Sequence, residues 1–351
     1  MALFFFYSFI SAAYGYWNLE STGKLILELT ASKVEYLHVV IDRLLQLFMV
    51  LVAFEVVLHT RHSSLQLMRW WLQGLTCEVL LHVLIYAVST DTLLQRASTF
   101  TEGNLAGLYY LISIFVALEY KRVANSKSSA NRFIVAALMG VLLSRSTAGI
   151  VLITILLCFQ YVFSATTRRR VLTRIVLLIL LLPSLVVVID VTGLDFGIRD
   201  KIFNEDLTAQ SFSRIDRLES ISVAIDLFSE NPLFGQGLQT YGFLSNDLLT
   251  GPLKEIYNGS YRRIPNNIYA ELAAELGLIG LVLYLGFIAS LIRLVAKSNS
   301  AGRRHWLLGL TGVLLYWNAF PTYSVIFIWV FFGLIMKSVQ SCKLAPIFSE
   351  A

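Results

Sequence analysis

Charge is scarce in this chain of 351 residues: Asp, Glu, Lys and Arg make up 15% of it, whereas apolar residues make up 56%. A typical soluble domain carries about a quarter charged residues. The scarcity therefore excludes a soluble globular protein and indicates a protein of the membrane. The basic residues lie in short clusters between apolar runs rather than on one soluble face, so nucleic acid is not expected as a partner.

Metal-binding, secretion and repeat signals are also missing. The three cysteines are widely separated, with no Cys-x-x-Cys pair and no histidine spacing of a zinc site, so we expect neither a metal nor another cofactor. Residues Met1–Trp17 lack a basic start and a small-residue cleavage site, and are predicted to form a first membrane helix rather than a cleaved signal. The absence of two matching halves disfavours a transporter built from inverted repeats.

The chain does contain repeated apolar runs of about the length that a helix needs to cross the hydrocarbon core. They predict an all-α fold: a single polytopic membrane domain, residues 1–351, with about ten transmembrane helices. The predicted spans are 2–17, 38–59, 70–89, 104–120, 133–144, 147–163, 175–191, 266–296, 306–319 and 323–337.

The distribution of Lys and Arg over alternate short loops predicts the orientation, because cytoplasmic loops carry the positive excess. One side carries fifteen basic residues and the other three. The first side is expected to be cytoplasmic, and ten spans place both termini there. Its basic residues are Arg61, Arg69, Lys121, Arg122, Lys127, Arg132, Arg168, Arg169, Arg170, Arg174, Lys297, Arg303, Arg304, Lys337 and Lys343, against Lys24, Lys33 and Arg96 on the other side.

Residues 192–265 remain as one large periplasmic loop, more polar than the rest, in which function is expected. Ser213 followed by Asp216 resembles a capping box. Apolar residues then recur at helical spacing and predict an amphipathic helix on the outer membrane surface, ended by Asn231-Pro232: Leu218, Ile221, Ile225 and Phe228.

Arg145 interrupts an apolar stretch whose first half, 133–143, is too short to cross a membrane, so the helix is expected to break at Ser144-Arg145-Ser146. An arginine at membrane depth must face a cavity or a partner and is therefore a functional candidate. The alternative is a turn residue that reaches the outer headgroups.

Two further pairs of arginines are candidates for anion binding. Arg214 and Arg217 are three residues apart on one face of the predicted amphipathic helix, where guanidinium groups suit diphosphate oxygens. Arg262 and Arg263 precede Asn266-Asn267, which is predicted to cap a long apolar helix. A solvated charged face or contact with lipid headgroups is the alternative for Arg214 and Arg217, whereas Arg262 and Arg263 indicate a second anionic contact at the outer membrane surface.

Glu78 and His82 lie four residues apart on the span 70–89 and share a helix face. Such a pair forms either a proton relay inside the membrane or a hydrogen-bonded packing pair. The first reading favours transport, and the second favours a structural role.

Residues 211–285 carry an ordered series of motifs. It runs from Arg217 through Asn231-Pro232-Leu233-Phe234-Gly235-Gln236-Gly237 to Asn266-Asn267-Ile268-Tyr269, and then to Glu275 and Gly277-Leu278-Ile279-Gly280. The series resembles the signature segment of the O-antigen ligase and polymerase family of bacterial membrane proteins. Ser144-Arg145-Ser146-Thr147-Ala148 is similar to an earlier Ser-Arg motif of that family.

The resemblance implies an enzyme of the bacterial inner membrane that transfers glycans from a polyprenyl diphosphate on the extracytoplasmic face, without nucleotide sugar or metal. Undecaprenyl-diphosphate-linked oligosaccharide is the implied substrate, and a chain-length regulator is a possible protein partner. The residues predicted to be catalytic are Arg145, Arg217 and Asn266, and those predicted to bind substrate are Arg214, Gly235, Gly237, Tyr241, Arg262, Arg263 and Asn267.

The chain departs from the family pattern at Asn266, where ligases have a histidine suited to act as general base. Asparagine cannot accept that proton, so the prediction is a repeat-unit polymerase, with Glu255 or Asp247 as candidate bases. The alternatives are a ligase acting on lipid A-core and a transporter of lipid-linked glycans. The chain is also short for the family, so one N-terminal span of the pattern is expected to be missing.

Overall fold

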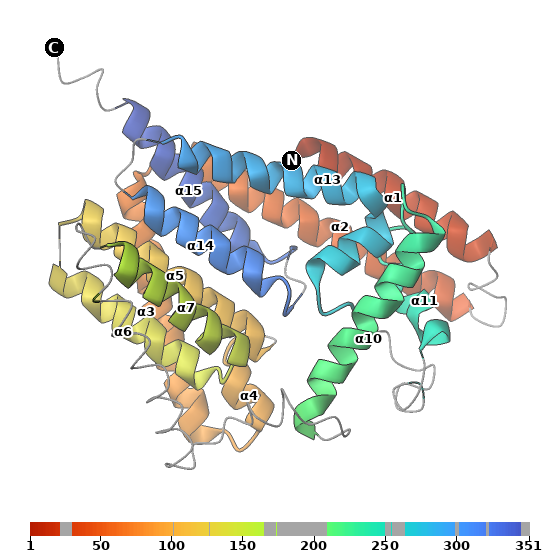
Figure 1. The fold of residues 1–351 in the computed structure, drawn as a ribbon, viewed down its shortest axis with the longest axis horizontal. Coiled ribbons are helices and arrows are strands. Elements are labelled where there is room, and N and C mark those ends of the chain that lie inside the picture. Colours follow the sequence, from red (N-terminus) through yellow and green to blue (C-terminus); the bar gives the residue numbers. More distant parts are fainter. Residues whose placement is uncertain are drawn as a thin grey trace. The chain divides into compact units, whose positions relative to one another are not determined.

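The computed structural model describes residues 1–21, 30–100, 102–125, 127–164, 209–249, 264–298, 302–320 and 323–344, together with Thr173 and Lys254. These residues form twelve helices and no strand, so the all-helical prediction is confirmed for the part of the chain that is described (Figure 1). They fall into two compact units, each built from segments far apart in the sequence.

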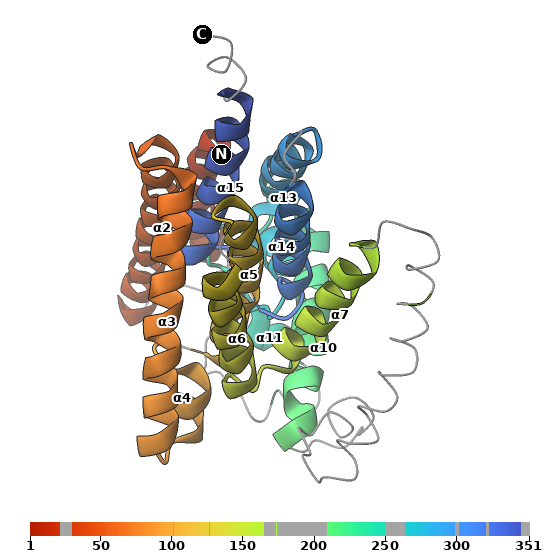
Figure 2. The same cartoon turned by 90° about the vertical axis from the view of Figure 1, so that its left-hand side faces the viewer.

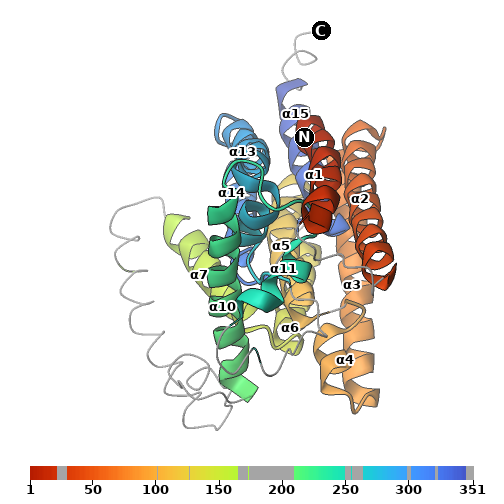
Figure 3. The ribbon, with the colours of Figure 1, turned by 90° about the vertical axis from the view of Figure 1, so that its right-hand side faces the viewer.

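The first unit comprises residues 1–61, 212–298 and 317–351. Helices α2 and α15 pack together, α1 packs on α2 and α13, and α13 packs on α15 and α11 (Figure 3). Stacked and edge-on aromatic rings of Phe54, Phe287, Trp329 and Phe332 fill the space between these helices. The helices are α1 (Ala2–Ser21), α2 (Thr30–His59), α10 (Ala209–Glu230), α11 (Tyr241–Leu248), α13 (Ile268–Ala296) and α15 (Ile326–Leu344).

The second unit comprises residues 62–211 and 299–316 and is organised around one buried helix, α5 (Gly103–Val123). Helices α3, α4, α6, α7 and α14 all pack on it (Figure 2). Its Glu119 is fully buried and is held by Arg122, with Nε 3.0 Å from Oε2, and by His305, with Nδ1 3.1 Å from Oε2. The surrounding helices are α3 (Ser64–Val88), α4 (Thr92–Ala97), α6 (Lys127–Leu143), α7 (Thr147–Phe163) and α14 (Arg303–Tyr316).

Three helices of the described chain, α3, α5 and α13, are long and apolar enough to cross a membrane. Shorter apolar helices occupy Ser128–Leu143, Thr147–Val162 and Ile326–Ser341. The remaining predicted spans coincide with α1, α2 and α14, except for 175–191, which lies outside the described residues. The protein is therefore a helical membrane protein, while the full set of ten crossings stays a prediction.

Candidate functional site

The helix break at Arg145 is confirmed: α6 ends at Leu143 and α7 begins at Thr147. Ser146 is the N-cap of α7, and its Oγ accepts a hydrogen bond of 3.2 Å from the Gly149 amide. Between the two helices Arg145 adopts φ 47°, a left-handed conformation that costs a non-glycine residue about 1–2 kcal/mol. A strained residue at a helix break points to a functional role.

Buried serines on both sides of Arg145 hold this turn. Ser146 Oγ donates to Asn104 Oδ1 at 3.0 Å and lies 2.6 Å from the Tyr316 hydroxyl. Ser144 Oγ donates to the Val141 carbonyl at 2.8 Å. Both serine side chains are fully buried. Ser146 thus anchors the turn to α5 and α14, Ser144 bonds back to α6, and the arginine between them is exposed.

The guanidinium of Arg145 rests on one aromatic side chain of α3. Its Nη2 donates to the Tyr86 hydroxyl at 2.6 Å, and its Cζ lies 5.4 Å from the centre of the Tyr86 ring. An arginine side chain has five N–H donors, so this contact orients the group and leaves donors directed outward. The arrangement is suited to binding an anion.

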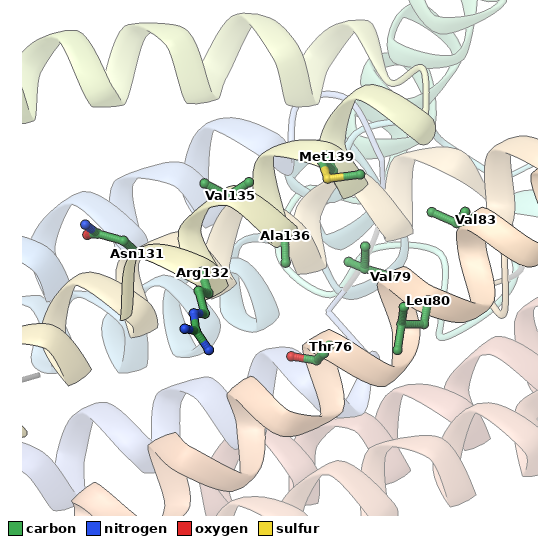
Figure 4. A pocket seen from close by; sticks show the side chains of 9 residues that line it. All are labelled: Thr76, Val79, Leu80, Val83, Asn131, Arg132, Val135, Ala136 and Met139. Atoms are coloured by element: carbon green, nitrogen blue, oxygen red, sulfur yellow. The ribbon is translucent and has the colours of Figure 1, made fainter. Parts of the chain in front are cut away.

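An apolar groove of about 460 Å³ lies between α3 and α6 (Figure 4). Val79 and Val83 of α3 face Val135, Ala136 and Met139 of α6 across it, and Asn131 and Arg132 lie at one end. Met139 is four residues before the end of α6 at Leu143, a helical rise of about 6 Å, and Arg145 follows two residues later. Val83 is three residues before Tyr86 on α3. The groove therefore leads along both helices toward the Arg145–Tyr86 contact.

The second candidate arginine pair lies on α10, whose start differs from the prediction. The helix begins at Ala209, so Ser213 and Asp216 lie inside it and the predicted capping box is wrong. The predicted end at Asn231-Pro232 is confirmed, since α10 ends at Glu230. Arg217 is half-buried, and only the backbone of Arg214 is described.

One face of α10 is buried and carries Val223, Ala224 and Leu227. Leu218 and Ile225, which belong to the predicted apolar stripe, are 63% and 57% exposed. Exposed apolar side chains on a helix of a membrane protein are suited to the lipid interface. The location of α10 on the membrane surface stays a prediction.

The start of α13 is confirmed, and the two asparagines before it have different roles. Asn267 is the N-cap: its Oδ1 accepts from the amides of Tyr269 at 2.9 Å and Ala270 at 3.1 Å. Asn266 instead donates from Nδ2 to Asp216 Oδ2 of α10 at 2.9 Å. Asn266, the residue predicted to replace a ligase histidine, is thus hydrogen-bonded to a carboxylate.

Helix α13 is broken at Gly277, which has φ 62° and ψ −165°. The loop after α10 enters this break: the amides of Gln236 and Gly237 donate to the carbonyls of Ala274 and Glu275, both at 2.8 Å. A Cβ at Gly235 would lie 2.5 Å from the Glu275 carbonyl carbon, so the close approach requires glycine. The Pro-Leu-x-Gly-x-Gly and Gly-Leu-x-Gly motifs therefore form one packing unit.

The other residues predicted to bind substrate in this loop make internal contacts. Gly237 lies against the backbone of Gly15 in α1. Tyr241 is buried, and its hydroxyl donates to the Ser220 carbonyl of α10 at 2.9 Å. Arg262, Arg263 and the candidate base Glu255 lie outside the described residues, and their roles stay predictions. Asp247 is exposed on α11.

A buried polar cluster in the first unit was missed from the sequence. Arg43 of α2 donates from Nη1 to Ser324 Oγ at 2.6 Å, lies 3.7 Å from Glu271 Oε1 and stacks 5.0 Å over the Tyr323 ring. When the side-chain amide of Gln239 is oriented with its oxygen toward Arg43, that oxygen accepts a hydrogen bond of 3.1 Å from Arg43 Nε. An arginine inside the predicted span 38–59 was the available signal.

Glu78 and His82 are confirmed as neighbours on α3, and both are hydrogen-bonded within the second unit. His82 Nδ1 lies 2.8 Å from the Tyr110 hydroxyl and its Nε2 lies 2.8 Å from the Gln95 carbonyl. Glu78 accepts from Tyr110 at 3.3 Å and from Thr99. With both ring nitrogens occupied, the geometry favours the packing pair over the relay. Within the described residues no group of three or more His, Cys, Asp and Glu side chains could hold a metal ion.

Comparison with protein families agrees with these motifs. Residues 133–285, from within α6 to Leu285 of α13, match the sequence model of the O-antigen ligase family. No curated protein matches the chain. The matched range contains both the Arg145 turn and the Asn266–Asp216 contact, and family members are glycan-transferring ligases and polymerases. The similarity to the O-antigen ligase family therefore covers residues 133–285 of this helical membrane protein.

Proposed function

We propose that the protein is a repeat-unit polymerase that transfers a growing glycan from its polyprenyl diphosphate to the non-reducing end of another lipid-linked repeat unit. The observation that carries the proposal is the Arg145 turn, in which a strained backbone presents an exposed guanidinium at a helix break. The proposal takes the turn to lie at the extracytoplasmic end of α6, as the predicted topology implies.

The proposal adopts the roles that the family resemblance implies for Arg145 and for Arg217, which are to stabilise the departing diphosphate. The leaving group gains negative charge as the bond to the sugar breaks, and fixed cations near that charge lower the barrier. Arginine suits this task because its planar fork makes two parallel hydrogen bonds to phosphate oxygens. Arg214, Arg262 and Arg263 add positive charge around the same lipid-linked substrate.

The polyprenyl tail of the donor lies in the α3–α6 groove. A lipid whose diphosphate is on Arg145 would direct its tail along α6 toward Met139 and Ala136, because the groove leads along that helix. The groove is apolar over most of its length, as a hydrocarbon tail requires. The glycan part of the substrate is bound beside α10, α11 and α13 in this proposal. These helices are held in place by contacts of Gly235, Gly237, Tyr241 and the N-cap Asn267.

Polymerase is favoured over ligase because Asn266 replaces the histidine of the ligases and its amide donates to Asp216. Purified protein in liposomes, given only a lipid-linked repeat unit, should produce a ladder of longer lipid-linked glycans. A strain lacking the protein should keep one repeat unit on lipid A-core. If that strain instead accumulates finished polymer on the lipid carrier, the protein is the ligase.

The orientation is tested with reporters fused at two sites on opposite sides of the predicted topology. A reporter after Ser128 should be active as a cytoplasmic fusion, and one after Gly251 as an extracytoplasmic fusion. The reverse result at either site would contradict the location of both termini in the cytoplasm.

A further inference from the structure

The contact between Asp216 and Asn266 joins residues fifty positions apart in the chain. Asp216 lies inside α10 rather than at its cap, since the helix begins at Ala209. The sequence predicted that the Asp216 side chain caps the start of the helix, but the side chain lies too far inside the helix for that role. Instead Oδ2 accepts a 2.9 Å hydrogen bond from Asn266, and both side chains are half-buried.

We propose that Asp216 is the general base of the transfer reaction and that Asn266 is the positioning residue that orients its carboxylate. This inference rests on the proposed function. Asn266 cannot act as a base, so the reaction needs another group to accept the proton. In this proposal a carboxylate from α10 takes that role, and the side-chain amide of Asn266 holds it in position.

The reaction balances with Asp216 in this role. The acceptor sugar hydroxyl gives its proton to the Asp216 carboxylate while the hydroxyl oxygen forms a bond to the anomeric carbon of the donor glycan. The bond from that carbon to the diphosphate oxygen breaks, and its electron pair leaves with the polyprenyl diphosphate. The protonated carboxyl then releases its proton to water, which restores the base.

The position of Asp216 on α10 suits it to act beside Arg217. Consecutive residues of an α-helix point about 100° apart, so the carboxylate and the guanidinium are directed to different sides of one site. Attack and departure occur on opposite sides of the anomeric carbon in an in-line displacement. Adjacent residues can therefore serve the attacking hydroxyl and the leaving diphosphate separately.

Other described carboxylates fit the role less well. Glu271 and Glu275 are only 1% and 3% exposed and face Arg43 and the Gln239 amide inside the helix packing. Asp226 and Asp247 are exposed and make no described contact with Asn266. Among the described acidic residues, Asp216 is the one hydrogen-bonded to the position of the ligase histidine.

Asp216→Asn separates a base from a structural contact, because asparagine can still accept the hydrogen bond from Asn266 but cannot accept a proton. The assay is the liposome polymerisation described above, with thermal stability of each purified variant measured alongside. We expect kcat to fall about 10²- to 10⁴-fold, the usual contribution of a general base, with KM for the lipid-linked donor changed by less than about threefold. Asp226→Asn, on the same helix, is the matched control and should keep wild-type activity.

A double variant restores a base at position 266, the partner of Asp216 in the hydrogen bond. Asp216→Asn combined with Asn266→His should recover at least about tenfold of the lost kcat, because imidazole is the base of the ligases. Asp216→Ala is the alternative single variant if Asp216→Asn is poorly produced, and the same loss of kcat is expected.

The outcomes distinguish this inference from the proposed function. If wild-type protein makes no ladder, the polymerase proposal fails. If wild type is active and a stable Asp216→Asn variant keeps kcat within about twofold, the carboxylate is a structural contact and the base assignment is wrong. A loss of kcat without recovery in the double variant also contradicts the assignment, provided that the double variant is as stable as the single one.

Discussion

Arg43 lies within the predicted span 38–59 and Arg145 lies between the predicted spans 133–144 and 147–163, and their surroundings are opposite. Arg43 is only 16% exposed and is enclosed by Glu271, Ser324, Tyr323 and Gln239. Arg145 is exposed, contacts Tyr86 and has a left-handed backbone. An arginine enclosed by protein groups from several segments holds those segments together, whereas an exposed arginine that contacts a single aromatic residue on a strained turn is a candidate for binding a ligand.

The comparison shows why charge at membrane depth is by itself an ambiguous signal. Both residues satisfy the rule that intramembrane charge faces partners rather than lipid. The partners of Arg43 belong to the protein, and those of Arg145 in our proposal belong to a substrate. Four substitutions test this distinction.

Arg43→Leu should destabilise the protein by about 3–5 kcal/mol, because it leaves Glu271 buried without its cation. The measurement is the unfolding temperature of purified protein in detergent. Arg145→Leu is the matched control and should change stability by less than about 0.5 kcal/mol, as exposed substitutions usually do. If Arg43→Leu keeps wild-type stability and loses activity, Arg43 belongs to the binding site and the comparison fails.

Arg145→Lys should lower kcat about 10²- to 10³-fold, nearly as much as Arg145→Ala, because a point charge cannot replace two parallel hydrogen bonds to the diphosphate. Polymer ladders and protein abundance are measured in the same strains. Full-length polymer from a normally abundant Arg145→Lys protein would show that charge alone is sufficient and that bidentate binding is wrong.

Tyr86→Phe should lower kcat about fivefold, since it removes the 2.6 Å hydrogen bond to Arg145 but keeps the ring below the guanidinium. Tyr86→Leu removes both contacts and should lower kcat about tenfold. In steady-state kinetics, kcat should be highest for the wild type, lower for Tyr86→Phe and lowest for Tyr86→Leu. Equal activity of all three proteins would mean that Arg145 is oriented by its turn alone.

Ala136→Trp should fill the α3–α6 groove and raise KM for a full-length polyprenyl donor about threefold, with kcat unchanged. The effect is small because the displaced tail moves into bilayer lipid, which is as apolar as the groove, and only packing contacts are lost. A short geranyl-diphosphate donor should be unaffected. Leu142→Trp, on the lipid-exposed surface of the same helix outside the groove, is the control, and an equal effect of both variants would exclude the groove as the tail site.

Local features of this protein were predictable because they depend on neighbouring residues. The break at Ser144-Arg145-Ser146 follows from an apolar run too short to cross the membrane, and the start of α13 follows from an asparagine cap. The end of α10 follows from Asn231-Pro232. The start of α10 was missed because Ser213 suits a cap, yet the helix continues four residues before it.

Residue patterns were sufficient to predict a helical membrane protein, the location of most of its helices, and the arginine that lies at a helix break. Tertiary structure decided the partners: that the loop at Gly235 closes the break at Gly277, that Arg43 is enclosed, and that Asn266 holds Asp216. Apolar length and caps act between residues a few positions apart, so they are visible in the sequence. Hydrogen bonds between residues tens or hundreds of positions apart depend on how helices pack, which no local pattern specifies.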